Sequence, residues 1–446
     1  MSRVLFTCWP FTGHVMPQMS IAAALRERGH EVAFYTGRAA AGVLEGEGIR
    51  HFPFEAVDEA AVTGHVEGLE AAVKHGRPQP GLTRRTLRNW LVETIPDQVR
   101  DLERVLAEWR PDAIATDLSM WGPIVVLNET SGVPVALSST FMGPLTPGRD
   151  APPPGLGMRP PRTPSLRARS AVMKRVMDLA GTPMRRRVDE LRAGHGLAPM
   201  GCTVNAFTGR LPLYLVMGLG ELDFDRVDLP PSVHYVGACV WHPRHGPETA
   251  EWLDRLDATR PWVHVTESTI HVGDPFLLRA AAQGLGGVPV EAILTTGGAR
   301  DPDALDLGPR AGNVHVTRWL SHDALLPRCA VVVTTGGPGT IMTALRVGVP
   351  LVIVPTTWDK PDNARRVVEA GVGVRLAATK CTPEALRAAV KHGRPQPGLT
   401  RRTLRNWLVE TIPDQVRDLE RVLAEWRPDA IATDPVSYTH LTLPTN

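Results

Sequence analysis

The sequence has few cysteines, little net charge and no long apolar run, and each shortage argues against a class of protein. The five cysteines lie far apart and form no CxxC pair, so no disulfide framework is indicated and a reducing cytoplasm is favoured. The 49 basic and 47 acidic residues leave a net charge of +2, which argues against a general nucleic-acid binder. The opening MSRVLFTCWP has too short an apolar stretch for a signal peptide, and no later stretch approaches a membrane span.

What is present is the composition of a globular protein, with 43% hydrophobic and 22% charged residues. A chain of 446 residues is too long for one ordinary core, so two domains are expected. We therefore predict a cytoplasmic, two-domain protein without a membrane span.

In the first half of the chain, short apolar runs alternate with amphipathic stretches. The runs RVLFTC, HEVAFYTG, DAIATD and GVPVALSS are typical of buried strands. Helical spacing separates them, in MPQMSIAAALRERG, which stops at Gly29, and in the apolar series Val99, Leu102, Leu106 and Trp109. This alternation indicates a parallel sheet with right-handed crossovers, which is a doubly wound α/β layer.

A second α/β series follows a polar segment, residues 241–261, which we interpret as an interdomain linker. Five further strands are indicated by WVHVTEST, VEAILTTG, NVHVTRW, AVVVTTGG and PLVIVPT, with helical patterns such as DPFLLRAAAQGL between them. We predict one domain over 1–240 and a second over 262–390, both with ligands at the C-terminal ends of the strands. The Pro- and Arg-rich stretch 151–200 is typical of an insert that shapes a site, or of a solvated loop followed by a helix.

A candidate pair for acid–base chemistry lies in the first domain. In CWPFTGHVMP a strand enters a turn with Gly13 and His14, and Pro17 stands where we expect the helix to begin, so His14 lies on the C-terminal rim. A histidine there can take a proton near neutral pH. Asp117 ends the strand DAIATD in the same sheet, and its carboxylate can accept the other ring N–H of His14 and stabilise the imidazolium. The alternative is structural, because either residue can instead cap a helix.

The strongest local signal is AVVVTTGGPGTIMTALRVG. A buried strand leads into Gly336, Gly337 and Gly339, and Thr340 opens a helix. Glycines let the backbone approach a phosphate, and a helix N-terminus supplies N–H donors and a favourable dipole. The stretch is not a P-loop, since no Lys follows the glycines, and it lacks the GxGxxG spacing. It indicates a phosphate-binding turn, with a merely tight strand-to-helix turn as the alternative.

Three more stretches place hydroxyl, aromatic and acidic groups after predicted strands. In VTESTI, Ser268 and Thr269 can donate hydrogen bonds to a phosphate. Trp319, just after NVHVT, can stack on a base, although a tryptophan is more often part of a core. PTTWDKPDNA places Asp359 and Lys360 after the last strong strand, where an acidic side chain suits sugar hydroxyls and where a turn with a helix cap would look similar.

Together these stretches resemble the family 1 glycosyltransferases of the GT-B fold, in particular the bacterial enzymes that decorate natural products. The resemblance covers roughly residues 3–390, and its motifs are specific in combination. The implied fold class is α/β, with two doubly wound Rossmann-like domains facing a cleft. The resemblance implies that the acceptor-side domain is 1–240 and that 262–390 binds the nucleotide sugar. GHVMP matches the family's GHxxP start, which implies that His14 is the general base and that Asp117 orients it.

The same resemblance extends to the family's donor signature, which runs from a tryptophan through a Gly-rich loop to an acidic residue. Here it runs from Trp319 through TTGGPGT to WDK. The match implies that Trp319 stacks on the nucleotide base, that the turn 336–340 holds the diphosphate, and that Asp359 binds the sugar.

Three residues depart from the family pattern. Thr335 stands where the family usually has a histidine that reaches the diphosphate, and a threonine hydroxyl can still donate a hydrogen bond. Ser268 stands where glycine is common, and Lys360 replaces a frequent glutamine, which alters one contact to the sugar.

A long identical repeat sets the C-terminal end apart. Residues 71–117 are identical, residue for residue, to 388–434. Repeat architectures are tandem, several copies long and imperfect, and a single perfect copy at long range is none of these. The copy begins where EGLEAAV and EALRAAV are already alike, and the final VSYTHLTLPTN resembles a translated sequencing adapter. We interpret 391–434 as an artefactual duplicate of 74–117, and 435–446 as a non-native tail.

We therefore expect an inverting, metal-independent glycosyltransferase without a cofactor, moving a sugar from a UDP or TDP sugar to a hydroxyl of a small hydrophobic natural product. No nucleic-acid partner is expected, and the oligomeric state is left open. One alternative is another GT-B enzyme such as a nucleotide-sugar epimerase, and a second is a non-catalytic GT-B-like protein that binds or activates a partner. The pair of His14 and Asp117 favours catalysis, because a binding module has no need of it.

Overall fold

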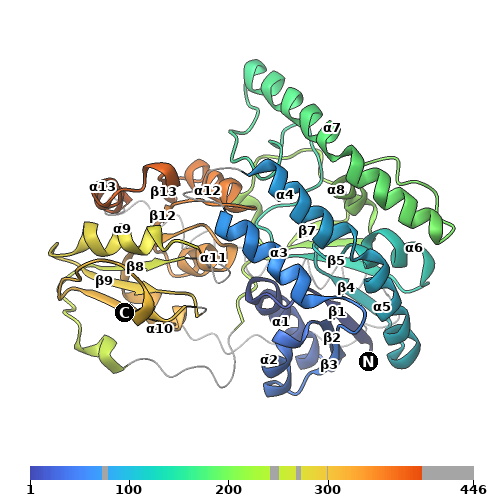
Figure 1. The fold of residues 1–446 in the computed structure, drawn as a ribbon, viewed down its shortest axis with the longest axis horizontal. Helices are drawn as coiled ribbons and strands as arrows, with labels where there is room; N and C mark the ends of the chain where they lie inside the picture. Colours follow the sequence, from blue (N-terminus) through green and yellow to red (C-terminus); the bar gives the residue numbers. More distant parts are fainter. Residues whose placement is uncertain (73–78, 242–250, 268–272, 299, 394–446) are drawn as a thin grey trace.

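The structure is a computed structural model that describes residues 1–72, 79–241, 251–267, 273–298 and 300–393. Figure 1 shows two lobes, each built around one sheet, with the early part of the chain in one lobe and the yellow-to-red part in the other. Every strand pairing in both sheets is parallel. The predicted α/β class with two doubly wound domains is confirmed.

The two sheets share one winding pattern, with orders β3-β2-β1-β4-β5-β6-β7 and β10-β9-β8-β11-β12-β13. The first sheet contains β1 (Arg3–Thr7), β2 (Glu31–Thr36), β3 (Arg50–Pro53), β4 (Ala113–Thr116), β5 (Val135–Ser139), β6 (Leu213–Val216) and β7 (Val233–Tyr235). The second contains β8 (Trp262–Thr266), β9 (Glu291–Thr295), β10 (Val314–Thr317), β11 (Cys329–Thr334), β12 (Leu351–Ile353) and β13 (Gly373–Arg375). The order reverses between β1 and β4 and again between β8 and β11, and at such points doubly wound sheets bind ligands.

Helices connect the strands in both lobes. The first lobe has α1 (Thr12–Glu27), α2 (Ala41–Gly46), α3 (Glu59–Ala72), α4 (Pro80–Leu87), α5 (Ile95–Trp109), α6 (Asn128–Thr130), α7 (Pro164–Gly194), α8 (Val204–Phe207) and the π-helical segments η3 (Arg88–Val92) and η4 (Pro123–Leu127). The second has α9 (Phe276–Leu285), α10 (His322–Leu325), α11 (Pro338–Arg346), α12 (Lys360–Glu369) and α13 (Pro383–Gly393). Short 3-10 turns are η1 (Arg38–Ala40), η5 (Thr208–Arg210), η6 (Gly220–Leu222), η7 (Glu251–Arg255), η8 (Pro302–Ala304), η9 (Leu326–Arg328) and η10 (Ala378–Lys380).

The central strands are buried on both faces, as their nearly continuous apolar runs predict. In β1, Leu5 and Phe6 are both fully buried and belong to different core clusters, because successive side chains point to opposite faces. In β11, Val332 and Val333 divide between two clusters in the same way. This burial fixes the register of the strands, and with it the positions of the residues that follow their C-terminal ends.

Four strands were not predicted from the sequence: β3, β6, β7 and β13. Each has only three or four residues, but length alone does not explain the miss, since β12 was predicted and has three.

The predicted start of the first helix is wrong. The helix α1 begins at Thr12, so Pro17 lies inside it and His14 lies in its first turn. The backbone N–H groups of His14 and Val15 both donate to the carbonyl of Phe11, at 2.8 and 3.0 Å. Proline disfavours helix interiors, but side-chain contacts of the first turn, described below, hold this turn in place ahead of Pro17.

The stretch 151–200 is irregular and then helical, as predicted, and its irregular part contacts the second lobe. Thr163 caps α7 by accepting a hydrogen bond from the backbone of Leu166. Before it, the backbone N–H groups of Gly155 and Gly157 donate to the two carboxylate oxygens of Asp362 in α12, at 2.6 and 2.7 Å. The insert is therefore part of the contact between the lobes.

A buried ion pair adds to this contact. The guanidinium of Arg366, also in α12, lies 2.8 Å from the carboxylate of Asp223 and over the ring of Phe224. Both charged side chains are almost fully buried. The start of α12, where Asp359 and Lys360 lie, is thus held against the first lobe.

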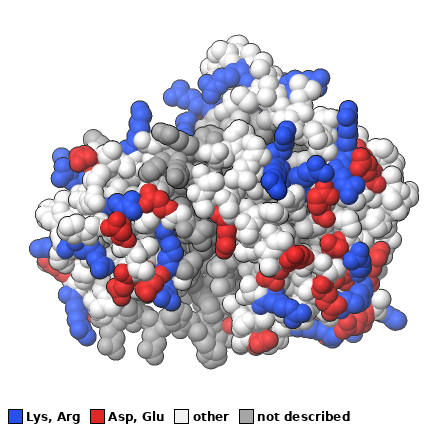
Figure 2. Space-filling model, viewed as in Figure 1, with Lys and Arg blue, Asp and Glu red and all other residues white. Residues whose placement is uncertain are grey.

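On the face shown in Figure 2, acidic and basic side chains lie interspersed over both lobes, in keeping with the balanced charge of the sequence. Among the helices that the structure describes, none combines the length and the apolar character that a bilayer span requires. Of the second copy of the repeat, only 388–393 belong to the described residues. These residues continue α13, and Val390 is buried in the core of the second lobe. The remainder of the predicted duplicate and the predicted tail lie outside the described residues.

Candidate active site

His14 and Asp117 meet at the reversal point of the first sheet. His14 follows β1, Asp117 follows β4, and these two strands are paired, with Thr7 opposite Thr116. The Nδ1 atom of His14 lies 3.0 Å from Oδ1 of Asp117. The side chain of Asp117 is 1% exposed and that of His14 is 20% exposed, so the imidazole is the member of the pair that reaches the surface. The predicted pair is therefore in hydrogen-bond contact.

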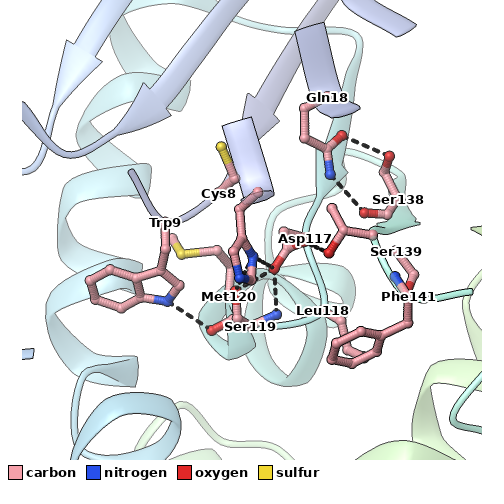
Figure 3. Close-up of polar contacts among 12 residues, drawn as sticks. Cys8, Trp9, Gln18, Asp117, Leu118, Ser119, Met120, Ser138, Ser139 and Phe141 are labelled. Atoms are coloured by element: carbon pink, nitrogen blue, oxygen red, sulfur yellow. Dashed lines mark hydrogen bonds and ion pairs between the residues drawn. The ribbon is translucent and has the colours of Figure 1, made fainter. Parts of the chain in front are cut away.

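The carboxylate of Asp117 is held on all sides. Its Oδ1 accepts hydrogen bonds from the backbone N–H of Ser119 at 2.8 Å and from the Ser119 hydroxyl, and Thr140 Oγ1 lies 3.5 Å from Oδ2. Figure 3 shows Asp117 and Ser119 side by side, with the indole N–H of Trp9 donating to the Ser119 carbonyl at 3.0 Å. Sequence analysis missed Ser119 and Thr140, although Ser119 stands two residues after the aspartate, where an Asx-type turn can form.

The charges of the pair stabilise one another. Burial disfavours the charged imidazole, but the charge of Asp117 and its hydrogen bond, with a smaller contribution from Asp359, raise the pKa of His14 above 6.5. Burial also disfavours the charged carboxylate, but His14 and the hydrogen bonds from Ser119 lower the pKa of Asp117. An ionised Asp117 that accepts from Nδ1 leaves Nε2 as the basic nitrogen of the imidazole.

A second anchor fixes the turn of helix that carries His14. Gln18 lies one turn further along α1 and is fully buried. Its amide donates to the carbonyl of Ser138 at 2.7 Å and accepts from the hydroxyl of the same residue at 2.7 Å, as Figure 3 shows. Since Ser138 belongs to β5, α1 is tied to two neighbouring strands, and the direction of the His14 side chain is set by both.

The glycine turn of the second lobe lies at the equivalent reversal point, after β11. Gly336 has φ of +104°, which favours glycine, and an added Cβ would lie 3.0 Å from Ile353 Cγ2 and 3.4 Å from the carbonyl oxygen of Lys360. An added Cβ at Gly337 or Gly339 meets nothing within 4 Å. Gly336 is therefore required by the fold, whereas the other two keep open space above the turn.

The polar groups around this turn point to a ligand. The N-cap of α11, Gly337, offers no side chain to its first N–H groups, and helix dipoles favour an anion at this end. The hydroxyl of Thr335 is buried and has no hydrogen-bond partner in the structure. Such a group is costly unless a ligand or water satisfies it. A diphosphate would accept hydrogen bonds from both the Thr335 hydroxyl and the N-terminal N–H groups of α11.

Asp359 is connected to the glycine turn by a residue that sequence analysis missed. The amide of Asn363, which is fully buried, donates both to the carboxylate of Asp359 at 2.7 Å and to the carbonyl of Gly336 at 3.0 Å. Asp359 makes no side-chain cap to α12, so the capping alternative does not account for it. Its spacing of four residues from Asn363 on a helix start is the signal that could have revealed this contact.

Burial raises the pKa of Asp359, although the hydrogen bond from Asn363 and the charge of Lys360 act in the opposite direction. Lys360 is buried, and its Nζ donates to Thr356 Oγ1 at 3.2 Å.

Trp319 is 42% exposed and stacks on the ring of His322, which leaves it outside the cores. The predicted contacts of Ser268 and Thr269 lie outside the described residues.

Aromatic side chains surround His14. The ring of Phe11 lies 5.8 Å from the imidazole and that of Trp90 lies 6.3 Å from it. Trp90 belongs to the π-helical segment η3, and such segments are frequent at functional sites. Trp358, from the second lobe, lies edge-on to Trp90 at 5.8 Å. Across the described residues, no three His, Cys, Asp or Glu side chains gather where a metal ion could be held.

Two parallel Rossmann-type domains, with a histidine–aspartate pair at one reversal point and a glycine turn at the other, form the arrangement that a resemblance to glycosyltransferases of the GT-B type implies. Comparisons with known proteins point to the same class. The family described as erythromycin biosynthesis protein CIII-like, C-terminal domain, matches residues 281–405. The 4'-demethylrebeccamycin synthase of Lentzea aerocolonigenes is 34% identical over 397 residues, covering 87% of this chain and 91% of the relative.

Demethyllactenocin mycarosyltransferase of Streptomyces fradiae is 28% identical over 391 residues, with 86% and 78% of the two chains covered. Among solved structures, the kitacinnamycin glycotransferase has a TM-score of 0.70 at 22% identity, covering 95% of this chain and 99% of its own. The spinosyn rhamnosyltransferase SpnG, in complex with thymidine diphosphate, has a TM-score of 0.65 at 19% identity, with 94% and 100% covered. The chain belongs to the bacterial natural-product glycosyltransferases of family 1, and the comparisons do not favour the alternatives of an epimerase or a binding protein.

Proposed function

We propose that this enzyme transfers a sugar, with inversion, from a nucleoside diphosphate sugar to a hydroxyl of a small hydrophobic acceptor. The observation that carries the proposal is the contact of 3.0 Å between His14 and a buried, fully hydrogen-bonded Asp117 at the reversal point of the acceptor-side sheet. The second supporting feature is the turn 336–340, whose unpartnered hydroxyl and open helix N-terminus suit a diphosphate.

In the proposed reaction, His14 acts as the general base. Its Nε2 takes the proton of the acceptor hydroxyl while the acceptor oxygen forms a bond to the anomeric carbon. Asp117 holds the imidazole through Nδ1 and stabilises the imidazolium that forms. The bond between the anomeric carbon and the diphosphate breaks on the opposite face of the sugar, and its electron pair goes to the leaving oxygen.

The second lobe binds the leaving group and the sugar. The first-turn N–H groups of α11 and the hydroxyls of Thr335 and Thr340 donate to the diphosphate as its charge develops. Asp359 and Lys360 contact the sugar hydroxyls, and Trp319 stacks on the base. The exposed face of Trp319 and the contact from Asn363 to Asp359 support these assignments.

We assign uridine or thymidine as the base of the donor. The solved relative SpnG binds thymidine diphosphate, which supports thymidine as the first candidate. The acceptor is an apolar molecule that contacts Phe11 and Trp90, since these rings lie next to His14. No metal or other cofactor takes part, because the donors of the turn 336–340 carry the charge of the diphosphate. The enzyme acts in the cytoplasm.

The test is to incubate the full chain with a panel of UDP and TDP sugars and apolar hydroxylated acceptors, and to read the product mass. The anomeric configuration of the product, from the proton coupling constant, decides between inversion and retention. A chelator added to the same reaction tests metal independence. Binding of the nucleoside diphosphate without any product from the whole panel would contradict the proposal.

A further inference from the structure

The segment that precedes Asp359 leaves its own lobe and packs on the other one. The indole of Trp358 is half-buried against the core cluster of the first lobe, and it lies edge-on to Trp90 at 5.8 Å. The residue next to it, Asp359, returns to the second lobe through its contact with Asn363. The segment formed by Trp358 and Asp359 therefore contacts both lobes, the first through Trp358 and the second through Asp359.

A buried carboxylate of the first lobe holds this segment. Glu70 lies near the end of α3 and is 2% exposed. Its Oε1 accepts a hydrogen bond from the hydroxyl of Thr357 at 2.6 Å and a second from the indole N–H of Trp358. Hydrogen bonds to an ionised carboxylate are stronger than those between neutral groups, especially away from water. Two adjacent residues of one lobe are thus bound by a single side chain of the other.

The backbone at this point is in an unusual conformation. Trp358 has φ of +59°, and with Arg110 it is one of two non-glycine residues with positive φ among the described residues. A bulky residue adopts the left-handed region only when its surroundings impose it, and such residues cluster at functional sites. The tertiary contacts of the Trp358 side chain with Glu70 and Trp90 supply that constraint, and the turn directs the next residue, Asp359.

We propose that Glu70 is a positioning residue, which fixes the segment 357–359 of the donor-side lobe against the acceptor-side lobe so that Asp359 holds the sugar opposite His14. The inference rests on the proposed function, since it assigns Glu70 a part in the geometry of sugar transfer. Glu70 itself touches none of the reacting groups.

The decisive variant is Glu70→Leu, which keeps the approximate size of the side chain and removes the oxygen that accepts both hydrogen bonds. The matched control is Glu67→Leu, on the same helix but exposed. For Glu70→Leu we expect kcat to fall and the donor KM to rise, with kcat/KM reduced about 10- to 100-fold, the loss that follows from a misplaced reacting group. The Kd of the free nucleoside diphosphate should stay within about twofold, because the ligand lacks the sugar that Asp359 holds.

Two further measurements separate positioning from folding. Trp358→Phe removes the indole N–H and keeps a ring, so its effect combined with Glu70→Leu should be smaller than the product of the two single effects. Hydrogen exchange in peptides over 351–366 should be faster in Glu70→Leu and unchanged in Glu67→Leu. A uniform loss in kcat/KM and nucleotide affinity, with a lowered melting temperature, would show a merely structural role and overturn the proposal.

The outcome is also informative if the parent chain transfers no sugar. That result would contradict the proposed function, while the exchange experiment would still decide whether Glu70 holds the segment. Unchanged exchange over 351–366 in Glu70→Leu would overturn the proposal whatever the activity of the parent.

Discussion

The two lobes wind their sheets in the same order and carry opposite chemistry at the same place. At the reversal point of the first sheet, the residues after β1 and β4 form a titratable pair, His14 and Asp117, whose charges stabilise one another. At the reversal point of the second, the turn after β11 presents a buried hydroxyl and backbone N–H groups. In the proposed function, the first site takes a proton and the second holds an anion.

The comparison shows that the fold decides where ligands bind and that the side chains decide what happens there. Parallel strands place the first residues of the following loops on one rim in both lobes. A base must have a pKa near the working pH, and it therefore needs a partner such as Asp117. An anion site needs donors that never titrate, and a glycine turn before a helix supplies them.

The largest expected effect is that of removing the base. His14→Ala should reduce transfer about 10²- to 10⁴-fold, because the acceptor then loses its proton without a positioned base. The free nucleoside diphosphate should bind as in the parent, since its site lies in the other lobe. Steady-state kinetics and calorimetry measure the two properties. Unchanged turnover in a folded variant would remove His14 from the mechanism.

A smaller loss is expected from Asp117→Asn, which keeps the shape of the side chain. The amide cannot stabilise the imidazolium, so the pKa of His14 should fall and transfer should drop by less than in His14→Ala. Because a general base must be neutral, the acid limb of the kcat/KM profile lies above pH 6.5 in the parent and should move to lower pH in the variant. A profile with the same acid limb in both proteins would speak against the pair.

Substitutions at the proposed anion site should change the affinity for the nucleoside diphosphate rather than the rate of proton transfer. Trp319→Ala should weaken binding of the free nucleoside diphosphate by about 5- to 150-fold, which is the usual range for a lost base stack of about 1–3 kcal/mol. Gly337→Val should weaken it as well, because the branched side chain would enter the open space above the turn. Calorimetry measures both. If both variants bind like the parent, the donor site lies elsewhere.

The pair should also make stability depend on pH. The raised pKa of His14 means that its contribution is complete below about pH 6.5 and is lost as the pH rises through that raised pKa. The lowered pKa of Asp117 means that its contribution is complete above about pH 3.8 and is lost as the pH falls through the lowered value. The free energy of unfolding of the parent should therefore exceed that of the His14→Gln variant by the largest amount between about pH 3.8 and about pH 6.5. Urea titrations from pH 3 to 8 test this, and a constant difference would exclude the coupling.

The smallest effect should come from the second copy of the repeat. Asp434 is the counterpart of Asp117 in an identical stretch, and yet it lacks the following sequence LSMW, which supplies Ser119. Asp434→Asn should leave transfer unchanged within error, while Asp117→Asn does not. Hydrogen exchange as slow in 391–434 as in 74–117 would show instead that the second copy is native structure.

Much of the fold and part of the site followed from local pattern. The long buried runs, the helical stripe of α5 and the glycine turn were predicted where the structure has them, because these elements depend on periodicity and turn chemistry within a few residues. The four short strands were missed, and the start of α1 was placed after His14 instead of before it. In each case neighbours in space, rather than the local sequence, complete the element.

What the sequence by itself determined is the class of the fold, the place of the pair on one rim and the identity of the groups to which the proposed chemistry is assigned. Only the tertiary structure decided how those groups are held. Gln18, Asn363 and Glu70 are ordinary polar residues in the sequence, and they act through partners 120, 27 and 288 positions away. The physical reason is that a hydrogen bond between distant residues leaves no periodic trace in the chain, whereas burial of a strand or helix face does.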